Sequence, residues 1–339
     1  MTVRVGVVGV GMMGQDHIRR LTRVLSGVEV VAVSDVDAER ARAVADGLRP
    51  ATGPARVFGS GEELIGSGGV DAVLICSWGE THEQYVLASL AAGMPVFCEK
   101  PLATTPEACR RILDAESRLG RRLVQVGYMR RYDAAYRALR EVVRSGDIGL
   151  PLLMHCTHRN SSVPDWYAGD SMITDTAVHE IDLVRWLFDE EIAAASVFAP
   201  RRSRHGGELQ DPLVLLLEMV SGLLVDVEIS VNIRYGYDIR GEVVGEDGTV
   251  ALGDASPIRV RRAGLAADRV PVDWRERFVR AYDVELQEWV DAVAGDGQLG
   301  PSAWDGYAAT VVSAAALEAL RTGTRVPVAL ADRPALYEK

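Results

Sequence analysis

Lysine is almost missing from this chain of 339 residues, because only two of its 37 basic residues, Lys100 and Lys339, are lysines and the others are arginines. A lysine ammonium is a compact, mobile charge whose proton affinity can be tuned, whereas a guanidinium is a planar fork that stays charged. Lys100 follows the apolar run 95–97, at the carboxyl end of an expected parallel strand, where open α/β sheets bind ligands. Lys100 is therefore a candidate functional residue; the alternative is a surface lysine retained by chance.

Cysteine is scarce as well, with four copies at Cys76, Cys98, Cys109 and Cys156. These positions form no CxxC pair and no zinc-finger spacing, which argues against a redox motif or a structural zinc site. Three of them lie in or beside apolar runs. We expect them to be reduced, small core residues of a cytoplasmic protein.

The sequence also lacks long apolar runs and an excess of positive charge. No run approaches the roughly 20 residues that span a bilayer, and the chain enters a strand directly after Met1, so we expect neither a membrane segment nor a secretory signal. The formal net charge of -11 argues against nucleic acid, whose phosphates require a basic face. The expected partner is therefore a small molecule.

The first 125 residues alternate between strand-like and helix-like segments. Strands are expected at 3–8, 28–34, 56–58, 71–76, 95–98 and 123–126, and helices at 12–25, 37–46, 81–92 and 106–119. Strands that are apolar throughout are typical of a sheet buried on both faces. This alternation predicts an α/β Rossmann domain, a doubly wound parallel sheet, over residues 1–125.

After about residue 127 the pattern changes to strands joined by short turns. Strands are expected at 152–157, 193–198, 213–220, 223–231 and 237–244, and helices at 134–145, 177–188, 281–294 and 305–322. Strands linked by tight turns pair antiparallel. Residues 126–339 are therefore predicted to form a second, α+β domain with an open, mainly antiparallel sheet.

A glycine motif follows the first expected strand and opens the first helix. Gly9, Gly11 and Gly14 fit the pattern GxGxxG, with Met12 and Met13 between them. In this context the glycines permit a tight turn, the approach of a pyrophosphate and close packing of helix on sheet. The helix N-terminus offers unpaired N–H groups to the phosphates. The motif predicts a dinucleotide site; the alternative is three turn glycines without a ligand.

Asp35 closes the second strand and indicates which dinucleotide binds. A carboxylate at that place can accept hydrogen bonds from both ribose hydroxyls and would repel a 2′-phosphate, which favours NAD over NADP. Arg40 and Arg42 lie downstream and could compensate for that repulsion. The alternative role of Asp35 is a helix or turn cap.

A loop after the fourth strand is expected to line the same cofactor cleft. It contains Ser77 and Trp78, and Thr81 is expected to cap the helix that follows. His82 in that helix is a further cofactor-binding candidate, although a lone helical histidine is equally often structural.

The second domain carries a carboxylate and an imidazole at helical spacing. Asp175 and His179 are four residues apart, so on a helix they share a face, and a carboxylate there can fix the tautomer of the imidazole and raise its basicity. Two alternatives remain open: a metal site formed with Asp182, and an N-cap aspartate beside a satisfied histidine. The absence of an HExxH pair, with Leu183 in place of the second histidine, disfavours the metal.

Together these residues suggest oxidation of an alcohol by hydride transfer. His179 would take the hydroxyl proton, and Lys100, as an ammonium group, would stabilise the alkoxide character on oxygen. NAD would accept the hydride, and no metal is then required.

The same residues resemble the Gfo/Idh/MocA family of dehydrogenases, and in particular its inositol-oxidising branch. Beyond the glycine motif and the Asp175/His179 pair, the matching stretches are Phe97–Thr105, Met129–Asp133, His158–Asn160, Val178–Asp182, Tyr235–Ile239, Ala281–Glu285 and Ala303–Tyr307. They cover roughly the whole chain and are far more specific than the glycines. The side chains of Met12 and Met13 are bulkier than the small residue that often follows the second glycine.

The resemblance implies an activity, a set of site residues and an assembly. It implies NAD-dependent oxidation of myo-inositol to 2-keto-myo-inositol, with a catalytic trio of Lys100, Asp175 and His179, and with Glu99 and Lys100 also beside the cofactor. Five residues would contact the polyol: Arg130, His158, Asn160, Thr176 and Tyr235. The second domain would bind substrate and form a homotetramer through its open sheet. The alternatives are a dehydrogenase for scyllo-inositol, chiro-inositol or an aldose, an enzyme that keeps its nicotinamide bound, and a non-catalytic nucleotide-binding sensor.

Overall fold

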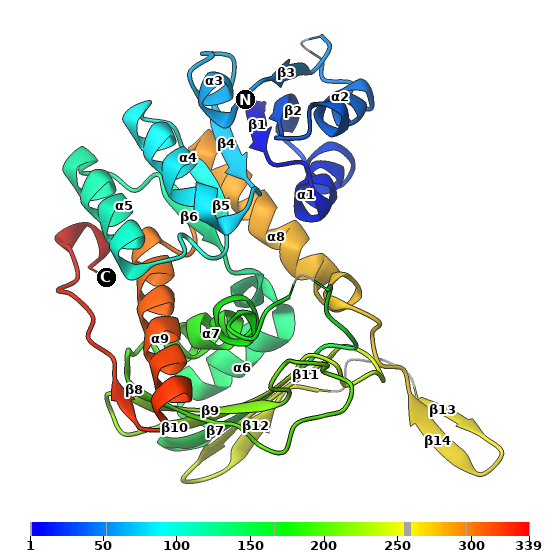
Figure 1. Cartoon of the computed structure of the whole chain (residues 1–339), viewed down its shortest axis with the longest axis vertical. Coiled ribbons are helices and arrows are strands. Elements are labelled where there is room, and N and C mark those ends of the chain that lie inside the picture. The colour runs from blue at the N-terminus through cyan, green and yellow to red at the C-terminus, as the bar shows by residue number, and fades with distance from the viewer. Residues whose placement is uncertain (1, 52, 166, 254–258, 296, 339) are drawn as a thin grey trace. The chain divides into compact units, whose positions relative to one another are not determined.

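The structure is a computed structural model that describes residues 2–51, 53–165, 167–253, 259–295 and 297–338. The chain divides into two compact units, whose residues can be followed in Figure 1 by the colour that marks residue number. The first unit comprises Met1–Tyr128, Tyr282–Thr310 and Ala331–Lys339, and the second comprises Met129–Ala281 and Val311–Leu330. The first break lies close to the expected boundary at 125, whereas 282–310 and 331–339 belong to the first unit and not, as expected, to the second.

Long-range packing explains why the chain returns to the first unit. The guanidinium of Arg20 is buried and lies 2.5 Å from the carboxylate of Asp283. Phe97 meets the buried Trp289 edge to face, with ring centroids 5.7 Å apart. Contacts over such sequence distances leave no local signal, so the strand and helix pattern alone did not predict this assignment.

The first unit is built on a six-stranded parallel sheet with the order β3-β2-β1-β4-β5-β6. Its strands are β1 (Val3–Val8), β2 (Val28–Ser34), β3 (Arg56–Phe58), β4 (Ala72–Ile75), β5 (Val96–Glu99) and β6 (Val124–Gly127). Its helices are α1 (Met12–Arg23), α2 (Ala38–Asp46), α3 (Gly61–Ile65), α4 (Gly79–Ala91) and α5 (Pro106–Leu119). The sequence analysis did not predict the short α3. The doubly wound sheet itself is confirmed.

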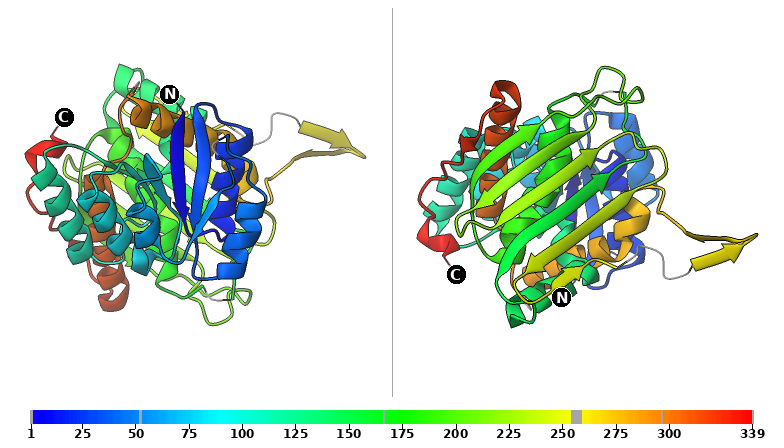
Figure 2. Two further views of the ribbon diagram at one scale, coloured as in Figure 1. Left: turned by 90° about the horizontal axis from the view of Figure 1, so that it is seen from above. Right: turned by 90° about the horizontal axis from the view of Figure 1, so that it is seen from below.

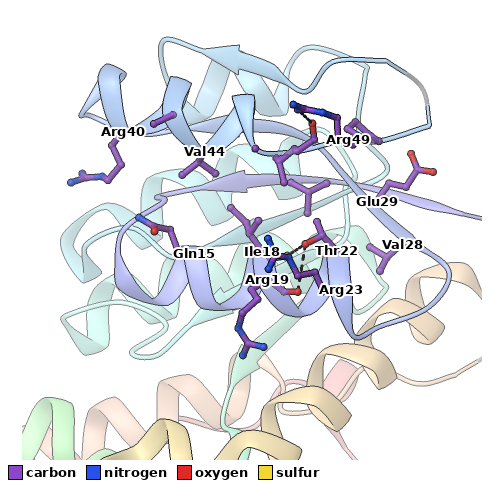
Figure 3. A pocket seen from close by; sticks show the side chains of 15 residues that line it. Gln15, Ile18, Arg19, Thr22, Arg23, Val28, Glu29, Arg40, Val44 and Arg49 are labelled. Carbon is purple, nitrogen blue, oxygen red and sulfur yellow. Dashed lines mark hydrogen bonds between the residues drawn. The ribbon is translucent and has the colours of Figure 1, made fainter.

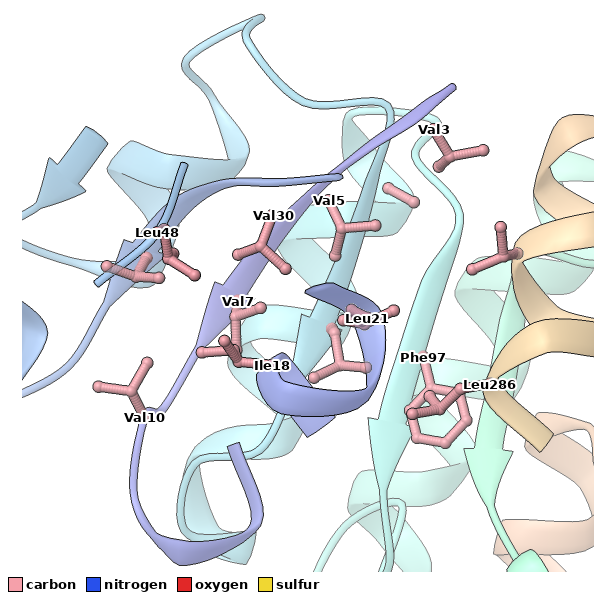
Figure 4. Packing of buried hydrophobic residues seen from close by; sticks show 14 of the residues in the cluster. Val3, Val5, Val7, Val10, Ile18, Leu21, Val30, Leu48, Phe97 and Leu286 are labelled. Carbon is pink, nitrogen blue, oxygen red and sulfur yellow. The ribbon is translucent and has the colours of Figure 1, made fainter. Parts of the chain in front are cut away.

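The core of the first unit explains why its strands are apolar throughout. Figure 4 shows Val5, Val7 and Val30 on the sheet with Ile18 and Leu21 of α1 packed against them. All five side chains are buried. Helices cover a parallel sheet on its faces, so both sides of each strand must be apolar.

The second unit is built on a seven-stranded sheet with the order β12-β11-β7-β10-β9-β8-β15. Its strands are β7 (Pro151–Arg159), β8 (Ile192–Phe198), β9 (Leu213–Met219), β10 (Leu224–Ser230), β11 (Asp238–Gly245), β12 (Thr249–Ala251) and β15 (Val326–Pro327). Only the β7–β10 pair is parallel among these pairings of the described residues. The predicted open, mainly antiparallel sheet is thus confirmed, with one parallel pair at its centre.

One face of this sheet is covered by helices and the other is open, as the right view in Figure 2, seen from below, shows. The covering elements include η1 (Met129–Tyr132), α6 (Ala134–Ser145), η2 (Met172–Ala177) and α7 (Val178–Phe188). Along β7 the side chains of Met154, Cys156 and His158 are buried, whereas those of Leu153 and His155 are exposed. This alternation is that of a half-buried strand.

Two long helices and a hairpin complete the chain. Helix α8 (Trp274–Ala294) is kinked at Phe278 and, like α9 (Ala303–Thr322), runs through a boundary between the units; η3 (Ala335–Tyr337) follows near the C-terminus. Strands β13 (Arg259–Arg262) and β14 (Leu265–Asp268) pair only with each other among the described strands. Within the described part of the chain, the length and apolar character needed to cross a membrane are found in no helix.

Candidate active site

The glycine motif of the first unit has the geometry that each glycine was expected to provide. Gly9 has φ +87°, and a Cβ there would lie 2.5 Å from the backbone nitrogen of Ser77. A Cβ on Gly14 would lie 2.1 Å from the carbonyl oxygen of Gly9, so only glycine lets α1 start so close to β1. At Gly11 no described atom lies within 4 Å of such a Cβ. The backbone of Gly11 is therefore open to a ligand, which fits a pyrophosphate at the start of α1.

Asp35 follows β2 and is held by the backbone of the same motif. Its Oδ2 accepts the N–H of Val10 at 2.7 Å, and its Oδ1 accepts the N–H of Asp37 at 2.9 Å and a guanidinium N–H of Arg40 at 2.6 Å. Burial opposes the ionisation of Asp35, but the hydrogen bonds from Arg40 and the two amides lower the net pKa of the carboxyl group. Asp35 is therefore an anion at the expected ribose position, and Arg40 is its counter-ion.

The loop after β4 differs in one respect from the expected arrangement. Helix α4 begins at Gly79, with Trp78 at the N-cap position, so Thr81 does not cap it. The hydroxyl of Thr81 instead lies 2.7 Å from that of Ser77 and donates to the carbonyl of Trp78. The helix thus starts two residues earlier than predicted, at Gly79 instead of Thr81.

His82 is buried between two loops of the first unit. Its Nδ1 lies 2.7 Å from the carbonyl oxygen of Pro101, and its Nε2 lies 3.0 Å from that of Ser77. Burial lowers the pKa of His82, although both carbonyls oppose this shift. The imidazole therefore joins the loop after β4 to the loop that carries Lys100. Direct contact of His82 with the cofactor stays a prediction.

Lys100 stands half-buried at the end of β5, as expected, and the Lys100–Pro101 peptide is cis. Glu99 beside it is buried, and its Oε2 accepts the backbone N–H of Lys100 at 3.2 Å. Its other oxygen lies 2.6 Å from Nε2 of His17 in α1. The sequence analysis missed His17; its place three residues after Gly14 was the only available signal.

A cleft of about 650 Å³ lies beside α1 and α2 (Figure 3), and Gln15, the residue after Gly14, is part of its lining. Its charged lining includes Arg19, Arg23, Arg40, Arg49 and Glu29. Arg19 pairs with Asp16, Arg40 with Asp35, and Arg49 donates to backbone carbonyls. Arg19, Arg40 and Arg49 are thus committed to protein partners.

In the second unit, Asp175 and His179 lie in a helical segment that begins as a π-helix and continues as an α-helix. Asp175 and Thr176 lie in η2, which is π-helical, and His179 lies in the first turn of α7. A π-helical turn in a longer helix is rare and frequently marks a functional site. Thr176 is buried, and its hydroxyl lies 2.6 Å from that of Tyr167. The expected helix exists, but the π-helical turn was not predicted.

Two of the expected polyol contacts, Arg130 and His158, meet at a buried carboxylate. Arg130 in η1 pairs with Glu180 of α7, and Nδ1 of His158 lies 3.0 Å from Oε1 and 3.1 Å from Oε2 of the same side chain. The ring of His158 lies 6.3 Å from that of His179. The structure therefore brings Arg130, His158 and His179 together around Glu180, which the sequence analysis did not name.

Tyr235 is placed apart from this cluster within the second unit. Its hydroxyl donates to Asp238 at 2.5 Å and accepts from Arg159 at 3.0 Å. Arg159 and His158 are neighbours on β7 and therefore point to opposite faces of the sheet. The hydroxyl of Tyr235 thus lies with Arg159 and Asp238, and its contact with the polyol stays a prediction.

Two further expectations concern Asn160 and the alternative metal site. Asn160 directly follows β7, and its backbone N–H donates to the carbonyl of Ser230 at 2.8 Å. Asp182, the third member of the alternative metal set, pairs through both carboxylate oxygens with Arg131, one of them at 2.8 Å. Among the described residues, no group of three or more acidic, histidine or cysteine side chains is placed to hold a metal ion.

A parallel dinucleotide-binding sheet joined to a mixed sheet with a buried histidine cluster defines a two-domain, Rossmann-type oxidoreductase. The chain belongs to the Gfo/Idh/MocA family. The model of its oxidoreductase domain with an NAD-binding Rossmann fold matches residues 3–128, and the model of its C-terminal domain matches residues 136–251. The predicted family, fold, oxidoreductase class and NAD cofactor are confirmed.

Similar proteins cover the chain from end to end. Inositol 2-dehydrogenase 3 of Saccharopolyspora erythraea is 57% identical over 338 residues, which are 99% of this chain and 98% of that protein. Inositol 2-dehydrogenase of Acidiphilium cryptum is 52% identical over 99% of this chain and 100% of its own. The crystal structure of myo-inositol dehydrogenase from Lactobacillus casei, in complex with NAD(H) and myo-inositol, matches with a TM-score of 0.95 and 39% identity over 100% of both chains.

Proposed function

We propose that the chain is an NAD-dependent inositol 2-dehydrogenase that oxidises myo-inositol to 2-keto-myo-inositol. The observation that carries this proposal is the identity of 57% over nearly the full length to a protein named inositol 2-dehydrogenase 3. The full-length match to a myo-inositol dehydrogenase that holds NAD(H) and myo-inositol supports the same substrate. It also makes the myo isomer the first choice over scyllo-inositol, chiro-inositol and aldoses.

The proposed catalytic residues are Lys100, Asp175 and His179. When bound, NAD supplies the acceptor for the hydride that leaves the carbinol carbon. His179 takes the hydroxyl proton as a general base, and Asp175 supports the imidazole. The ammonium group of Lys100 holds the hydroxyl oxygen and stabilises the negative charge that develops on it. The near-absence of lysine elsewhere in the chain supports a specific need for this amine.

The proposed cofactor site consists of the glycine motif, Asp35 and the loops after β4 and β5. The open position at Gly11 and the anionic Asp35 fit a pyrophosphate and an adenosine ribose respectively. The proposed polyol contacts are Arg130 and His158, whose side chains meet at Glu180, together with Asn160, Thr176 and Tyr235. A cyclic hexol needs several such polar partners, because each buried hydroxyl without one costs free energy.

A homotetramer formed through the open face of the second sheet is part of the proposal. Leu153 is exposed there, and the side chain of His155 is 51% exposed beside Asp226 of β10. An open sheet face with apolar side chains is a surface that a second copy can cover. Light scattering coupled to gel filtration would give the mass of the assembly; a monomer at micromolar concentration would contradict this part.

The direct test is the initial rate of NADH formation with a panel of polyols. We expect turnover of myo-inositol with NAD and slower turnover of other inositols and aldoses. Lys100→Ala should lose the activity with all of these polyols. If another polyol is oxidised and myo-inositol is not, the substrate assignment moves to that polyol. If no polyol is oxidised by the wild-type protein, the dehydrogenase proposal is wrong and the nucleotide-binding sensor replaces it.

A further inference from the structure

Glu180 is a fully buried carboxylate at the centre of the second unit. It lies on α7, one residue after the proposed base His179, and its side chain is 1% exposed. Its two partners come from other elements: Arg130 from η1 and His158 from β7. Both partners are proposed polyol contacts, so one side chain fixes the position of two residues that would touch the substrate.

We propose that Glu180 is a positioning residue of the polyol site, which holds the proton of His158 on Nδ1 and so presents Nε2 as a hydrogen-bond acceptor to a substrate hydroxyl. This inference rests on the proposed function, because it assigns a role to the same site. A residue with this role acts through His158 and Arg130 and does not itself touch the substrate.

The tautomer of His158 follows from the groups around Nδ1. Both oxygens of Glu180 lie within 3.1 Å of that nitrogen. A carboxylate can only accept a hydrogen bond, so a lone pair on Nδ1 would face it with repulsion, whereas an N–H group donates to it. Nη2 of Arg130 also lies 3.0 Å from Nδ1, whereas Nη1 donates to Glu180. Nδ1 thus faces one possible donor and two carboxylate oxygens, and the two acceptors favour an N–H group at this nitrogen. Nδ1 therefore carries the proton.

The opposite nitrogen of His158 faces Tyr237. The phenol oxygen lies 3.5 Å from Nε2, and the two rings meet at 88° with centroids 5.6 Å apart. Burial raises the pKa of Tyr237 to about 12, so its hydroxyl keeps its proton and can donate. A neutral imidazole with its proton on Nδ1 has its one lone pair on Nε2. At 3.5 Å the phenol of Tyr237 is a weak donor to it, so a polyol hydroxyl that comes closer would replace Tyr237 as the donor.

The two phenols and the thiol around the cluster keep their protons near neutral pH, and the guanidinium of Arg277 is a further charge that acts on the phenols. Burial raises the pKa of Tyr136 of α6 and of Cys156 of β7, as it does that of Tyr237. Burial also opposes the ionisation of Glu180, but Arg130 and His158 lower its net pKa. The cluster is therefore one carboxylate, Glu180, paired with the guanidinium of Arg130 and within hydrogen-bond distance of Nδ1 of His158.

A second buried ion pair on the same helix provides a matched control. Asp182 lies two residues after Glu180, its side chain is also 1% exposed, and it pairs with Arg131. Asp182→Asn and Glu180→Gln each remove one buried carboxylate charge from α7 and leave an arginine behind. If both carboxylates are only structural, the two variants should behave alike.

The test compares both variants with the wild-type protein in polyol kinetics. For Glu180→Gln we expect kcat/KM for the polyol to fall on the order of 100-fold, as a misplaced contact does, with the KM for NAD unchanged. We expect Glu180→Asp to recover part of this loss. The kcat/KM of Asp182→Asn should stay within about twofold of the wild-type value, even if its melting temperature falls by as much as that of Glu180→Gln. Equal losses in both variants, or an unchanged kcat/KM in Glu180→Gln, would overturn the proposal.

A second measurement does not depend on turnover. In protein labelled with ¹⁵N-histidine, the six histidines report their tautomers, and the signal of His158 is the one lost in His158→Asn. We expect a neutral imidazole with its proton on Nδ1 in the wild type and a loss of that form in Glu180→Gln. A His158 protonated on Nε2 in the wild type would refute the inference even if the protein oxidises inositol. Failure of all polyols in the wild-type panel would refute the proposed function and leave the tautomer result standing.

Discussion

Nε2 of His17 lies 2.6 Å from Oε1 of Glu99, although 82 residues separate them in the chain. The pair is buried, and the other oxygen of Glu99 accepts the backbone N–H of Lys100. One carboxylate thus ties the first turns of α1 to the loop that presents the proposed catalytic amine. The position of the backbone at Lys100 and that of His17 in α1 therefore depend on the same side chain.

Two glycines of the motif are expected to serve different purposes, Gly14 the folding of the unit and Gly11 the binding of the cofactor. We expect Gly14→Ala to lower the melting temperature markedly, because its Cβ would lie 2.1 Å from the carbonyl of Gly9. Gly11→Ala should leave the melting temperature nearly unchanged, since no described atom lies within 4 Å of the added group, yet weaken NAD binding at least tenfold. Thermal scans and calorimetric titration with NAD would check this. Equal stability of the two variants would contradict the close packing of α1.

Asp35 and Arg40 should together set the choice between NAD and NADP. In Asp35→Asn the repulsion of a 2′-phosphate is gone and Arg40 loses its counter-ion, so it can pair with the phosphate. Since a hydrogen bond to a charged group contributes about 1.5–3 kcal/mol, we expect kcat/KM for NADP to rise by at least tenfold relative to NAD. The gain should vanish in the double variant with Arg40→Ala. A gain that persists without Arg40 would show that another group binds the phosphate.

The scarcity of lysine makes the proposed catalytic amine accessible to a chemical test. Lys100 and Lys339 are the only lysines, so pyridoxal phosphate followed by borohydride has few targets besides the terminal amine. We expect inactivation that parallels labelling of Lys100, protection by NAD with inositol, and unchanged inactivation in Lys339→Arg. Lys100→Ala should slow turnover by about 10²- to 10⁴-fold. Enzyme that is fully labelled at Lys100 and still active would exclude the proposed role.

The buried Glu180 should contribute stability with a defined dependence on pH. Burial opposes its ionisation, but Arg130 and His158 lower the pKa of the folded protein's carboxyl group below the ordinary 4.5. A carboxyl group whose pKa is lowered by folding stabilises the fold fully at pH values above its pKa in the unfolded protein. This contribution is lost as the pH falls through its pKa in the folded protein. The free energy of unfolding of wild type minus that of Glu180→Gln should thus be constant above about pH 5 and shrink below 4.5. Urea unfolding at several pH values would measure it; a difference independent of pH would contradict the buried ion pair.

The sequence predicted best those elements whose signals are local. The bounds of β2, β3 and α5 agree with the prediction to the residue, because apolar runs, a proline at the helix start and a glycine after its end mark them. Elements that depend on distant partners were missed. The return of 282–310 to the first unit and the parallel pairing of β7 with β10 are examples.

The residues of the candidate site show the same difference between local signals and distant partners. The glycine motif, Asp35 and Lys100 lie where their order in a strand–turn–helix pattern places them. Glu180 and His17 were not predicted, because their partners are 22 to 82 residues away and neither spacing nor composition marks such a pair. The partners of Tyr235, Arg159 and Asp238, were not predicted either, and its expected role as a polyol contact stays a prediction.

The hairpin of β13 and β14 offers a way to observe the assembly without a label. Residues 261–269 are all exposed, and the turn between the strands has positive φ at Ala263 and Gly264. A pair of strands without other support is only marginally stable in water, and exposed tips are preferred sites of proteolytic nicking. Trypsin should therefore cut first after Arg261 or Arg262 and leave two fragments of unequal size. The rate of that cut, followed across protein concentrations, would reveal whether neighbouring subunits shield the hairpin.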